Sequence, residues 1–438
     1  MTSVRTELLE AAVRIGRGLC DTAYWSGGRC NWVGRSQREV SQLGSRLRPT
    51  VTALGPELYA GTAGIGFFLA QLSTRVDLVE VRETAHGAIR QAIHGSDGLP
   101  SEFGRSFYSG LIGIAYAAAH VGILLDNHDL IEEALRVAYR ATVPQADTLL
   151  DVISGNAGAL VPLLWLANLP GAERLVDAAM LFAEELATAA NRHKDAWCWD
   201  NDRACGRGVG HTPLCGMAHG AAGMGLALIE AGVAGGRDHW VAGGLAAFRY
   251  EDELYDNRHQ NWPDLREHGH GYDRTHASDS PKFMVAWCHG AGGIGLARLR
   301  AVQLLAERRA GLLVGAQRAL DATMQHLRLL PVDSDASPCH GRAGLAETLL
   351  FGTEVLGDPK YANYARRMWR RLMPTYKYEP WPCGVPSGRY NPSFMLGHAG
   401  IGYAFLRASD PGSTPSLLLP KAQAAVHSSD IGRLELSS

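Results

Sequence analysis

A short glycine motif, Gly-x-x-Gly running into small or aliphatic residues, recurs along most of the 438-residue chain. Consecutive motifs begin about 45 to 70 residues apart, the length of a helical hairpin with its connections. Because a glycine pair lets neighbouring backbones approach closely, each motif predicts the tight start of a buried helix. The seven motifs begin at Gly61, Gly110, Gly155, Gly220, Gly290, Gly341 and Gly397. They predict an all-α protein built from seven helical hairpins.

The stretches between the motifs have the pattern of amphipathic helices. In one of them Leu175, Phe182 and Leu186 recur at helical spacing, beside the charged residue Glu184. Few of these stretches alternate between apolar and polar residues in the manner of a strand. Each unit is therefore predicted to contain an outer amphipathic helix, a loop, a glycine start and an inner, more apolar helix.

The two ends of the repeat array indicate how the units are arranged. An open solenoid needs polar terminal caps, yet the last motif, in residues 397–406, is as apolar as the first, in residues 58–69. We therefore predict a closed ring, an α/α toroid over residues 51–420, with the glycine motifs at one end of a central cavity. Residues 1–50 are predicted to form a leading helix and an irregular crossing. Residues 421–438 form a tail without a strong pattern, for which disorder is one expectation.

Composition narrows the class of protein. A formal charge of -2 and a pI near 6.8 give no electrostatic reason to expect nucleic acid or an anionic membrane as partner. The chain has no signal-peptide pattern and no apolar run long enough for a membrane span, so we expect a cytoplasmic protein. In that reducing compartment the eight cysteines are expected to be thiols or metal ligands. Two longer polar stretches, 191–214 and 250–282, are expected to be functional or mobile loops.

Two segments place a cysteine and a histidine directly before a repeat glycine: Trp287-Cys288-His289-Gly290 and Cys339-His340-Gly341. Thiolate and imidazole are ligands that zinc prefers, and two thiolates balance the charge of the ion while a histidine adds none. Three protein ligands leave the fourth tetrahedral position open for water or substrate, as in catalytic zinc sites. We therefore predict a zinc site formed by Cys288, Cys339 and one histidine. The spacing does not decide between His289 and His340.

Two further residues have a similar place relative to the motifs. His219 directly precedes Gly220, and Asp151 lies four residues before Gly155. A ring would bring both to the end of the cavity that holds the metal, where His219 could transfer a proton and Asp151 could orient a histidine or hold a substrate group. Structural alternatives stay open for all these residues: a hydrogen-bonded core histidine, a helix N-cap aspartate, and Cys-His pairs that only pack against their glycine turns.

Taken together, these segments resemble the lanthionine synthetase C-like family. The resemblance runs from about Leu58 to Pro420 and is most specific in Ala218-His219-Gly220 and the two Cys-His-Gly segments. The sequence of residues 286–298 is most similar to the cyclase domain of bifunctional class II lanthipeptide synthetases. Two other segments share this similarity, Asn261-Trp262-Pro263-Asp264 and Asp151-Val152-Ile153-Ser154-Gly155.

The resemblance implies both a fold and a reaction. It implies a sevenfold α/α toroid with catalytic zinc on Cys288, Cys339 and His340, with His340 preferred over His289. The family adds a peptide cysteine thiol to a dehydroalanine or dehydrobutyrine of the same precursor peptide, which forms a thioether ring. The resemblance gives His219 the role of acid and base and makes Asp151 its accompanying aspartate.

This sequence departs from the family pattern in two ways. The bifunctional enzymes carry a dehydratase domain before the cyclase, whereas here the toroid begins almost at once, so we expect a separate dehydratase to act on the precursor peptide. Stand-alone class I cyclases tend to have an arginine four residues before the first zinc cysteine. This chain has Met284 there, with Lys282 nearby, which calls into question a role for a positive charge at that point.

Other functions fit parts of the sequence. A related zinc enzyme could add a small thiol, such as glutathione, to dehydrated proteins. A non-catalytic toroid could hold a precursor peptide or scaffold modifying enzymes, although retention of all the site residues counts against it. An inverting glycosidase would need two carboxylates across a sugar cleft, and only Asp151 stands in a motif.

Overall fold

The computed structural model describes residues 3–38, 48–143, 148–205, 212–266, 282–305, 309–385 and 390–422. Parts of both long polar stretches, including 206–210, and the predicted tail beyond residue 422 lie outside these ranges.

An inner helix begins directly after each repeat glycine, as the motifs predict. The second glycine of a motif is needed because the helix start packs on the preceding turn: a Cβ at Gly293 would clash with the backbone oxygen of Trp287. These helices are apolar on nearly all sides, so they pack against neighbours in every direction. The inner helices are α2 (Thr62–Ser73), α4 (Leu111–Leu125), α6 (Asn156–Leu166), α9 (Ala221–Gly235), α11 (Ala291–Leu304), α13 (Arg342–Leu356) and α15 (His398–Ser409).

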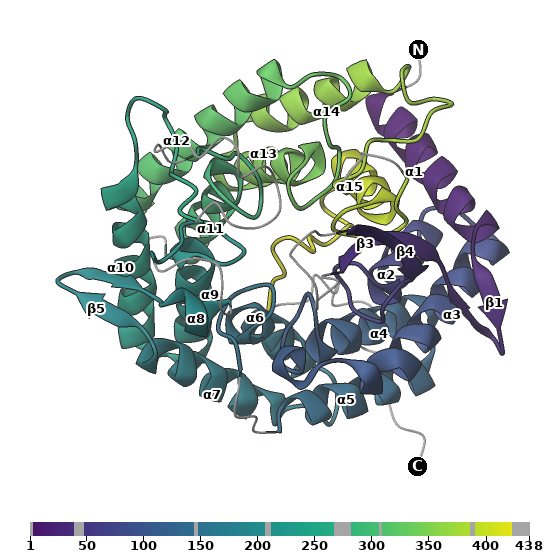
Figure 1. The fold of residues 1–438 in the computed structure, drawn as a ribbon, viewed down its shortest axis with the longest axis horizontal. Helices are drawn as coiled ribbons and strands as arrows, with labels where there is room; N and C mark the ends of the chain where they lie inside the picture. The colour runs from purple at the N-terminus through teal and green to yellow at the C-terminus, as the bar shows by residue number, and fades with distance from the viewer. Residues whose placement is uncertain are drawn as a thin grey trace.

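An outer layer of amphipathic helices surrounds the inner one (Figure 1). In α5, for example, Leu130, Ala134, Val137 and Ala141 face inward while charged residues face solvent. The outer helices are α1 (Val4–Asp21), α3 (Val79–Gly95), α5 (His128–Ala141), α7 (Leu175–Thr188), α10 (Asp238–Leu254), α12 (Arg309–Leu329) and α14 (Lys360–Leu372).

The ring closes between the two ends of the chain. Every inner helix contacts the next one around the circle, and α15 contacts α2 (Figure 1). Each inner helix packs most extensively on the outer helix that follows it, and α15, the last, packs on α1. This arrangement confirms the predicted α/α toroid. None of the described helices has the length and apolar character needed to cross a membrane.

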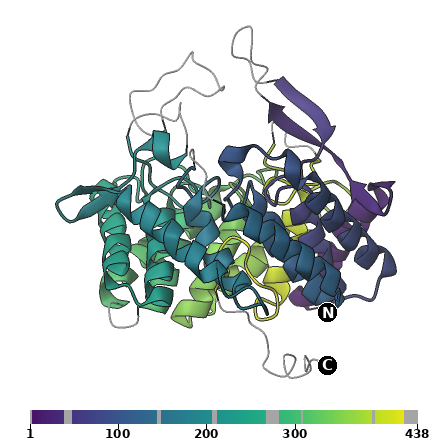
Figure 2. The ribbon, with the colours of Figure 1, turned by 90° about the horizontal axis from the view of Figure 1, so that it is seen from below.

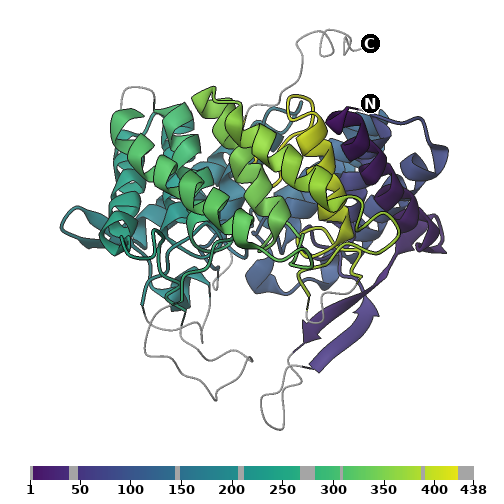
Figure 3. The same ribbon diagram turned by 90° about the horizontal axis from the view of Figure 1, so that it is seen from above.

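Short antiparallel hairpins extend from the ring of helices. The stretch expected to be irregular forms β1 (Tyr24–Ser26) with β2 (Arg29–Asn31), and β3 (Val33–Arg38) with β4 (Arg48–Ala53). A third hairpin joins β5 (Asn191–His193) to β6 (Ala196–Cys198), followed by the short helix α8 (Asn201–Ala204). Two 3-10 turns, η1 (Ser96–Gly98) and η2 (Ser101–Phe103), lie between α3 and α4. The β3–β4 hairpin projects from one end of the ring, while the chain begins at the other end (Figures 2 and 3).

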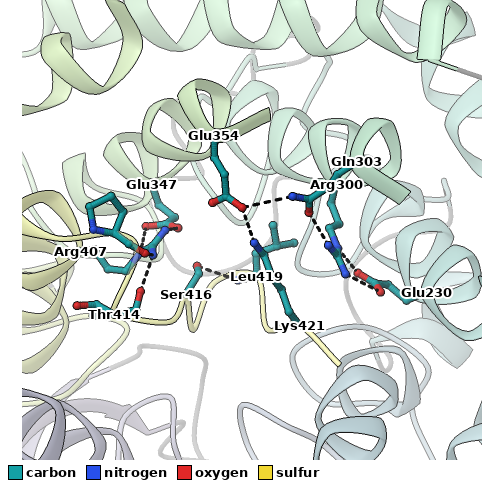
Figure 4. A network of polar contacts seen from close by, with 11 residues as sticks. Glu230, Arg300, Gln303, Glu347, Glu354, Arg407, Thr414, Ser416, Leu419 and Lys421 are labelled. Carbon is teal, nitrogen blue, oxygen red and sulfur yellow. Dashed lines mark hydrogen bonds and ion pairs between the residues drawn. The ribbon is translucent and has the colours of Figure 1, made fainter. Parts of the chain in front are cut away.

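The segment after α15 crosses the interior of the ring (Figure 1). Buried Tyr108 donates its hydroxyl hydrogen to the Leu417 oxygen at 2.7 Å, and the Trp287 indole donates to the Leu418 oxygen at 3.2 Å. Charged side chains of the inner helices surround this segment (Figure 4). Arg407 pairs with Glu347 through two contacts of 2.9 and 2.5 Å, a bidentate geometry that offsets the cost of burying both charges.

Candidate active site

The turns before the repeat glycines are joined edge to edge around one end of the ring. In five of these turns, the backbone N–H of the residue two positions before the glycine donates to the residue at the same position in a neighbouring turn. Cys288 donates to the Cys339 oxygen at 3.2 Å. Two cysteines from adjacent units thereby become neighbours. The other bonds of this series are Ala218 to Cys288 at 3.1 Å, Cys339 to Met395 at 3.0 Å, Met395 to Tyr59 at 2.8 Å and Tyr59 to Tyr108 at 2.8 Å.

The turn that carries Cys288 is fixed by a glycine and an asparagine. Gly290 has a φ of 78°, and a Cβ there would clash with the Met284 oxygen. The Asn261 side chain bridges the two sides of the turn. It donates to the Met284 oxygen at 2.9 Å and accepts from the Ala291 N–H at 3.0 Å. The latter bond satisfies a free N–H at the start of α11. The predicted ligand is therefore held on rigid backbone.

Cys288, Cys339 and His340 form one compact group. Their sulfur and ring-nitrogen atoms all lie within 4.8 Å of one another. Both cysteines are buried, and His340 is partly exposed. Such a set of two soft sulfur donors and one imidazole, open on one side, fits zinc in a site with a free coordination position.

The surroundings of His340 orient its ring. Its Nε2 donates to the Gly384 oxygen at 3.1 Å and lies 3.5 Å from a carboxylate oxygen of Asp335. The ring also forms a side-chain hydrogen bond with Cys288. A proton fixed on Nε2 leaves Nδ1 as the nitrogen that can bind a metal, the arrangement common to histidine ligands. Asp335 and Gly384 carry no motif, and the sequence analysis missed both.

The pKa values of the two cysteine thiols shift in opposite directions. The hydrogen bond with Cys339 holds the pKa of the Cys288 thiol well below its usual range, against the opposing effect of burial and with help from His340. The same contact, together with burial, raises the pKa of Cys339. The lowered pKa favours the thiolate form of Cys288, which is the protonation state that a metal ligand requires.

His219 and Asp151 form a direct ion pair, and their turns are also joined by the hydrogen bond from the Val152 N–H to the Ala218 oxygen, at 3.0 Å. Asp151 is fully buried, and its other oxygen accepts from the Ser154 N–H at 2.6 Å. Burial alone would lower the pKa of His219, but the charge and the hydrogen bond of Asp151 leave it raised above the usual value. His219 can therefore hold and release a proton near neutral pH.

Cys205 lies beside the His219–Asp151 pair, and the three could also be grouped as metal ligands. Burial and the nearby charge of Asp151 raise the pKa of the Cys205 thiol to about 12. This group offers a single sulfur, and its other two members, His219 and Asp151, already pair with each other. The chemistry therefore favours the Cys288 group, with its two sulfur donors, as the metal site.

His289, the rival to His340, faces a different group. Its ring centroid lies 5.8 Å from that of His219, and within the described part of the chain it is not grouped with the two cysteines. Burial is the largest effect on this side chain and lowers its pKa to about 4, so the ring is neutral. The geometry favours His340 as the third ligand, as the family resemblance implied.

The sequence was compared with known families and structures. The pattern of the family described as "Lanthionine synthetase C-like protein" matches residues 52–419. The chain belongs to the lanthionine synthetase C-like family. This membership supports a lanthipeptide-type cyclase at the level of the family. No curated protein matches the chain.

Among solved structures, this lanthionine synthetase C-like chain is similar to nisin cyclase, with 20% identity over 81% of this chain and 89% of that one and a TM-score of 0.59. That likeness supports the shared fold. Two weaker likenesses carry no argument. They are a sugar epimerase from a ruminal bacterium (11% identity, 94% and 99% coverage, TM-score 0.47) and an α-1,6-mannanase from a Salegentibacter species (10% identity, 93% and 99% coverage, TM-score 0.45).

Arg266 adds a cation that the sequence analysis of this lanthionine synthetase C-like protein missed. Its guanidinium binds both oxygens of Asp264, at 2.9 and 2.5 Å, and its Nη2 lies 3.6 Å from the Met284 sulfur. Burial lowers the pKa of Arg266, but Asp264 and, less strongly, the charges of Cys288 and Cys339 leave it raised. Arg266 therefore supplies positive charge near the cysteines although Met284 does not. The only signal in the sequence was the polar composition of the stretch 250–282.

Proposed function

We propose that the protein is a zinc-dependent lanthipeptide cyclase that adds peptide cysteine thiols to dehydroalanine or dehydrobutyrine, forming lanthionine or methyllanthionine rings. One observation carries this proposal. Two cysteines and a histidine that suit zinc lie at the same end of the ring as a His–Asp pair whose aspartate is buried, on adjacent turns of one backbone series. A thiol addition needs both parts: a site that stabilises a thiolate, and a group that handles the proton.

Cys288, Cys339 and His340 would hold the metal. Zinc bound there supplies a Lewis acid that keeps a substrate thiol deprotonated at neutral pH. Two thiolate ligands balance the charge of the zinc ion, and the neutral imidazole adds none. The site with its metal would therefore be uncharged and could accept one more thiolate. The side chain of Asp335 and the oxygen of Gly384 hold the imidazole in place.

His219 would move the proton. Because its Nδ1 faces Asp151, Nε2 is the nitrogen that exchanges a proton with the substrate. Addition forms a bond between the substrate sulfur and the β-carbon of the dehydro residue, and the electron pair of the double bond moves to the α-carbon. The α-carbon then takes the proton from Nε2, while the thiol proton is lost to base, so the reaction is redox-neutral. Arg266 would stabilise the negative charge that develops on the adjacent carbonyl oxygen.

The chemistry defines the partners. The substrate is a precursor peptide that contains cysteines and has already lost water from serine or threonine, so a dehydratase must act before this enzyme. All eight cysteines are free thiols, which supports a cytoplasmic, reducing location.

The first experiment is zinc content by elemental analysis, on the wild type and on Cys339→Ala. We expect one zinc per chain in the wild type and its loss in the variant. Cys30→Ala is the matched control, because Cys30 is a buried thiol outside the metal group. A folded wild type without zinc would contradict the proposal and favour a scaffold.

The second experiment is cyclisation of a dehydrated peptide, followed by thiol alkylation and mass spectrometry. We expect the wild type to remove free peptide thiols without a change in peptide mass, and Cys339→Ala to leave them alkylatable. Addition of glutathione to the peptide instead of ring closure would identify the protein as a small-thiol transferase. Neither product from a zinc-loaded enzyme would contradict the thiol-addition chemistry.

A further inference from the structure

Tyr59 stands in the first repeat at the place that the two candidate ligand cysteines take in theirs, two residues before the glycine. Its hydroxyl donates a hydrogen bond to the sulfur of Cys339 at 3.0 Å. The contact joins residues 280 positions apart and exists only because the ring closes. A hydroxyl thus lies against one of the two sulfurs of the candidate metal group.

The backbone and the ring of Tyr59 are both held in place. Its N–H donates to the Tyr108 oxygen, and its own oxygen accepts from the Met395 N–H, each at 2.8 Å. The aromatic ring packs edge-on against Tyr108, with centroids 6.5 Å apart. Burial, and next to it the charge of Cys339, raise the pKa of Tyr59, so the phenol keeps its hydrogen at neutral pH. The hydrogen bond is therefore a fixed feature of the site.

This hydrogen bond distinguishes the two sulfurs once a metal is bound. The side-chain partners of the Cys288 thiol are Cys339 and His340, which are both in the ligand group. Those contacts are replaced when all three residues bind an ion. The contact from Tyr59 comes from outside the group and can persist. A donor to a thiolate withdraws electron density, which weakens its donation to the metal and its nucleophilicity.

We propose that Tyr59 is a positioning residue of the metal centre, which tunes the Cys339 sulfur and protects it from alkylation. This inference rests on the proposed function. A cyclase must hold an electrophilic dehydro residue beside its own two thiolates without adding them to it. Hydrogen bonding to Cys339 lowers the reactivity of that ligand, so the substrate thiolate remains the better nucleophile. It also makes the metal a stronger Lewis acid for that substrate thiol.

The test uses the full-length protein with cobalt(II) in place of zinc, and Tyr59→Phe as the variant. Loss of the donor raises the energy of the sulfur lone pairs, so the sulfur-to-cobalt charge-transfer band should shift to longer wavelength. Tyr108→Phe is the matched control: it removes the hydroxyl of the neighbouring tyrosine, which bonds to the Leu417 oxygen and not to sulfur. Its band should stay at the wild-type position. Far-UV circular dichroism verifies that both variants fold.

A second readout is alkylation of the zinc-loaded protein by iodoacetamide, with Cys339 followed by peptide mass spectrometry. We expect Tyr59→Phe to react at least about tenfold faster, the effect of losing one hydrogen bond to a charged group, and Tyr108→Phe to match the wild type. Unchanged band and rate in a metal-loaded Tyr59→Phe overturn this inference and leave the proposed function standing. A wild type that binds neither zinc nor cobalt overturns both.

Discussion

Gly384 shows how a single residue without any functional group can support the proposed metal centre. A Cβ at this position would lie 2.6 Å from the Ser337 hydroxyl, 2.8 Å from Nε2 of His340 and 3.0 Å from a carboxylate oxygen of Asp335. Only glycine leaves room for its own carbonyl oxygen to accept from the histidine ring. The side chains around the imidazole therefore leave no room for a larger residue at position 384.

We therefore expect Gly384→Ala to displace His340 and to weaken zinc binding by about 10- to 100-fold, the usual cost of losing a partner of a metal ligand. Chelator competition measures this affinity. Gly18→Ala is the control, because a Cβ at Gly18 meets no atom within 4 Å. Equal affinities in both variants would show that the Gly384 contact does not position the ligand.

Arg266 provides a second test at the residue scale. Arg266→Gln removes the cation near the cysteines and His219, so cyclisation should slow by about 10- to 100-fold with zinc content unchanged. Because the charge of Arg266 lowers the pKa of His219, the variant should also raise that pKa in an NMR titration. Arg258→Gln, an exposed change in the same polar stretch, should have neither effect.

An Arg266→Gln enzyme that cyclises at the wild-type rate, with an unchanged His219 titration, would contradict the proposed role of the arginine. So would a loss of zinc from this variant, since it would indicate damage to the metal group rather than loss of a charge.

The sequence revealed the candidate ligands and the His–Asp pair because they stand next to glycines that the repeat makes visible. Asp335, Gly384 and Arg266 lie in loops, where no period relates them to the site, and only folding brings them there. The choice between His289 and His340 could not be made from spacing, since both directly precede a repeat glycine. It follows from which ring faces the cysteines.

At the scale of elements, outer helices fix the turns from which inner helices begin. Glu251 on α10 is fully buried and accepts hydrogen bonds from the N–H groups of Gly216 and Ala222, at 2.8 and 2.9 Å. These bonds hold the turn that carries His219 at the start of α9. Burial raises the pKa of Glu251 to about 7, although Arg298 and the two backbone donors favour its charged form.

The raised pKa predicts a dependence of stability on pH. The folded protein keeps a proton on Glu251 up to about pH 7, whereas the unfolded chain releases it near 4.5. The resulting stabilisation is complete below pH 4.5 and is lost as pH rises to about 7. Glu251→Gln has no such proton to lose. Its free energy of unfolding relative to the wild type should therefore rise between these pH values, by on the order of 3 kcal/mol.

Chemical denaturation at pH 5, 6, 7 and 8 measures this difference, which should level off above pH 7. Glu253→Gln is the control on the same helix, where the side chain is exposed. A constant difference between Glu251→Gln and the wild type across the series would mean that the folded carboxyl titrates at its ordinary pKa.

Among the elements, periodicity revealed helices better than strands. The amphipathic stretch that begins at Leu175 is α7, with its predicted apolar positions buried. The hairpins β1–β2 and β5–β6 were missed because strands of three residues are too short to show an alternating pattern. The order of packing was also not visible, since each inner helix pairs chiefly with the outer helix after it.

For the whole molecule, closure follows from pairing between the two ends of the chain. Helix α1 packs on α15, and α15 contacts α2, so the first and last inner helices are covered on both sides. An open array would leave these terminal faces to solvent, where terminal repeats fray. Closure also brings Tyr59 of the first unit to Cys339 of the sixth. The closure of the ring therefore determines part of the geometry of the site.

This leads to a prediction for Leu8, a fully buried residue of α1. Leu8→Asp places an unpaired charge in the core and should lower the free energy of unfolding by several kcal/mol, about 3 or more. Because α1 covers the closure, hydrogen exchange should become faster in α15 and α2 together and stay slow in α9, on the far side of the ring (Figure 1). Glu10→Ala, an exposed change on α1, should leave all three protected. Faster exchange confined to α1 would instead mean that residues 1–50 are a separate lead-in, as the domain boundary at residue 51 predicts, and that the ring is held closed by α15 and α2 alone.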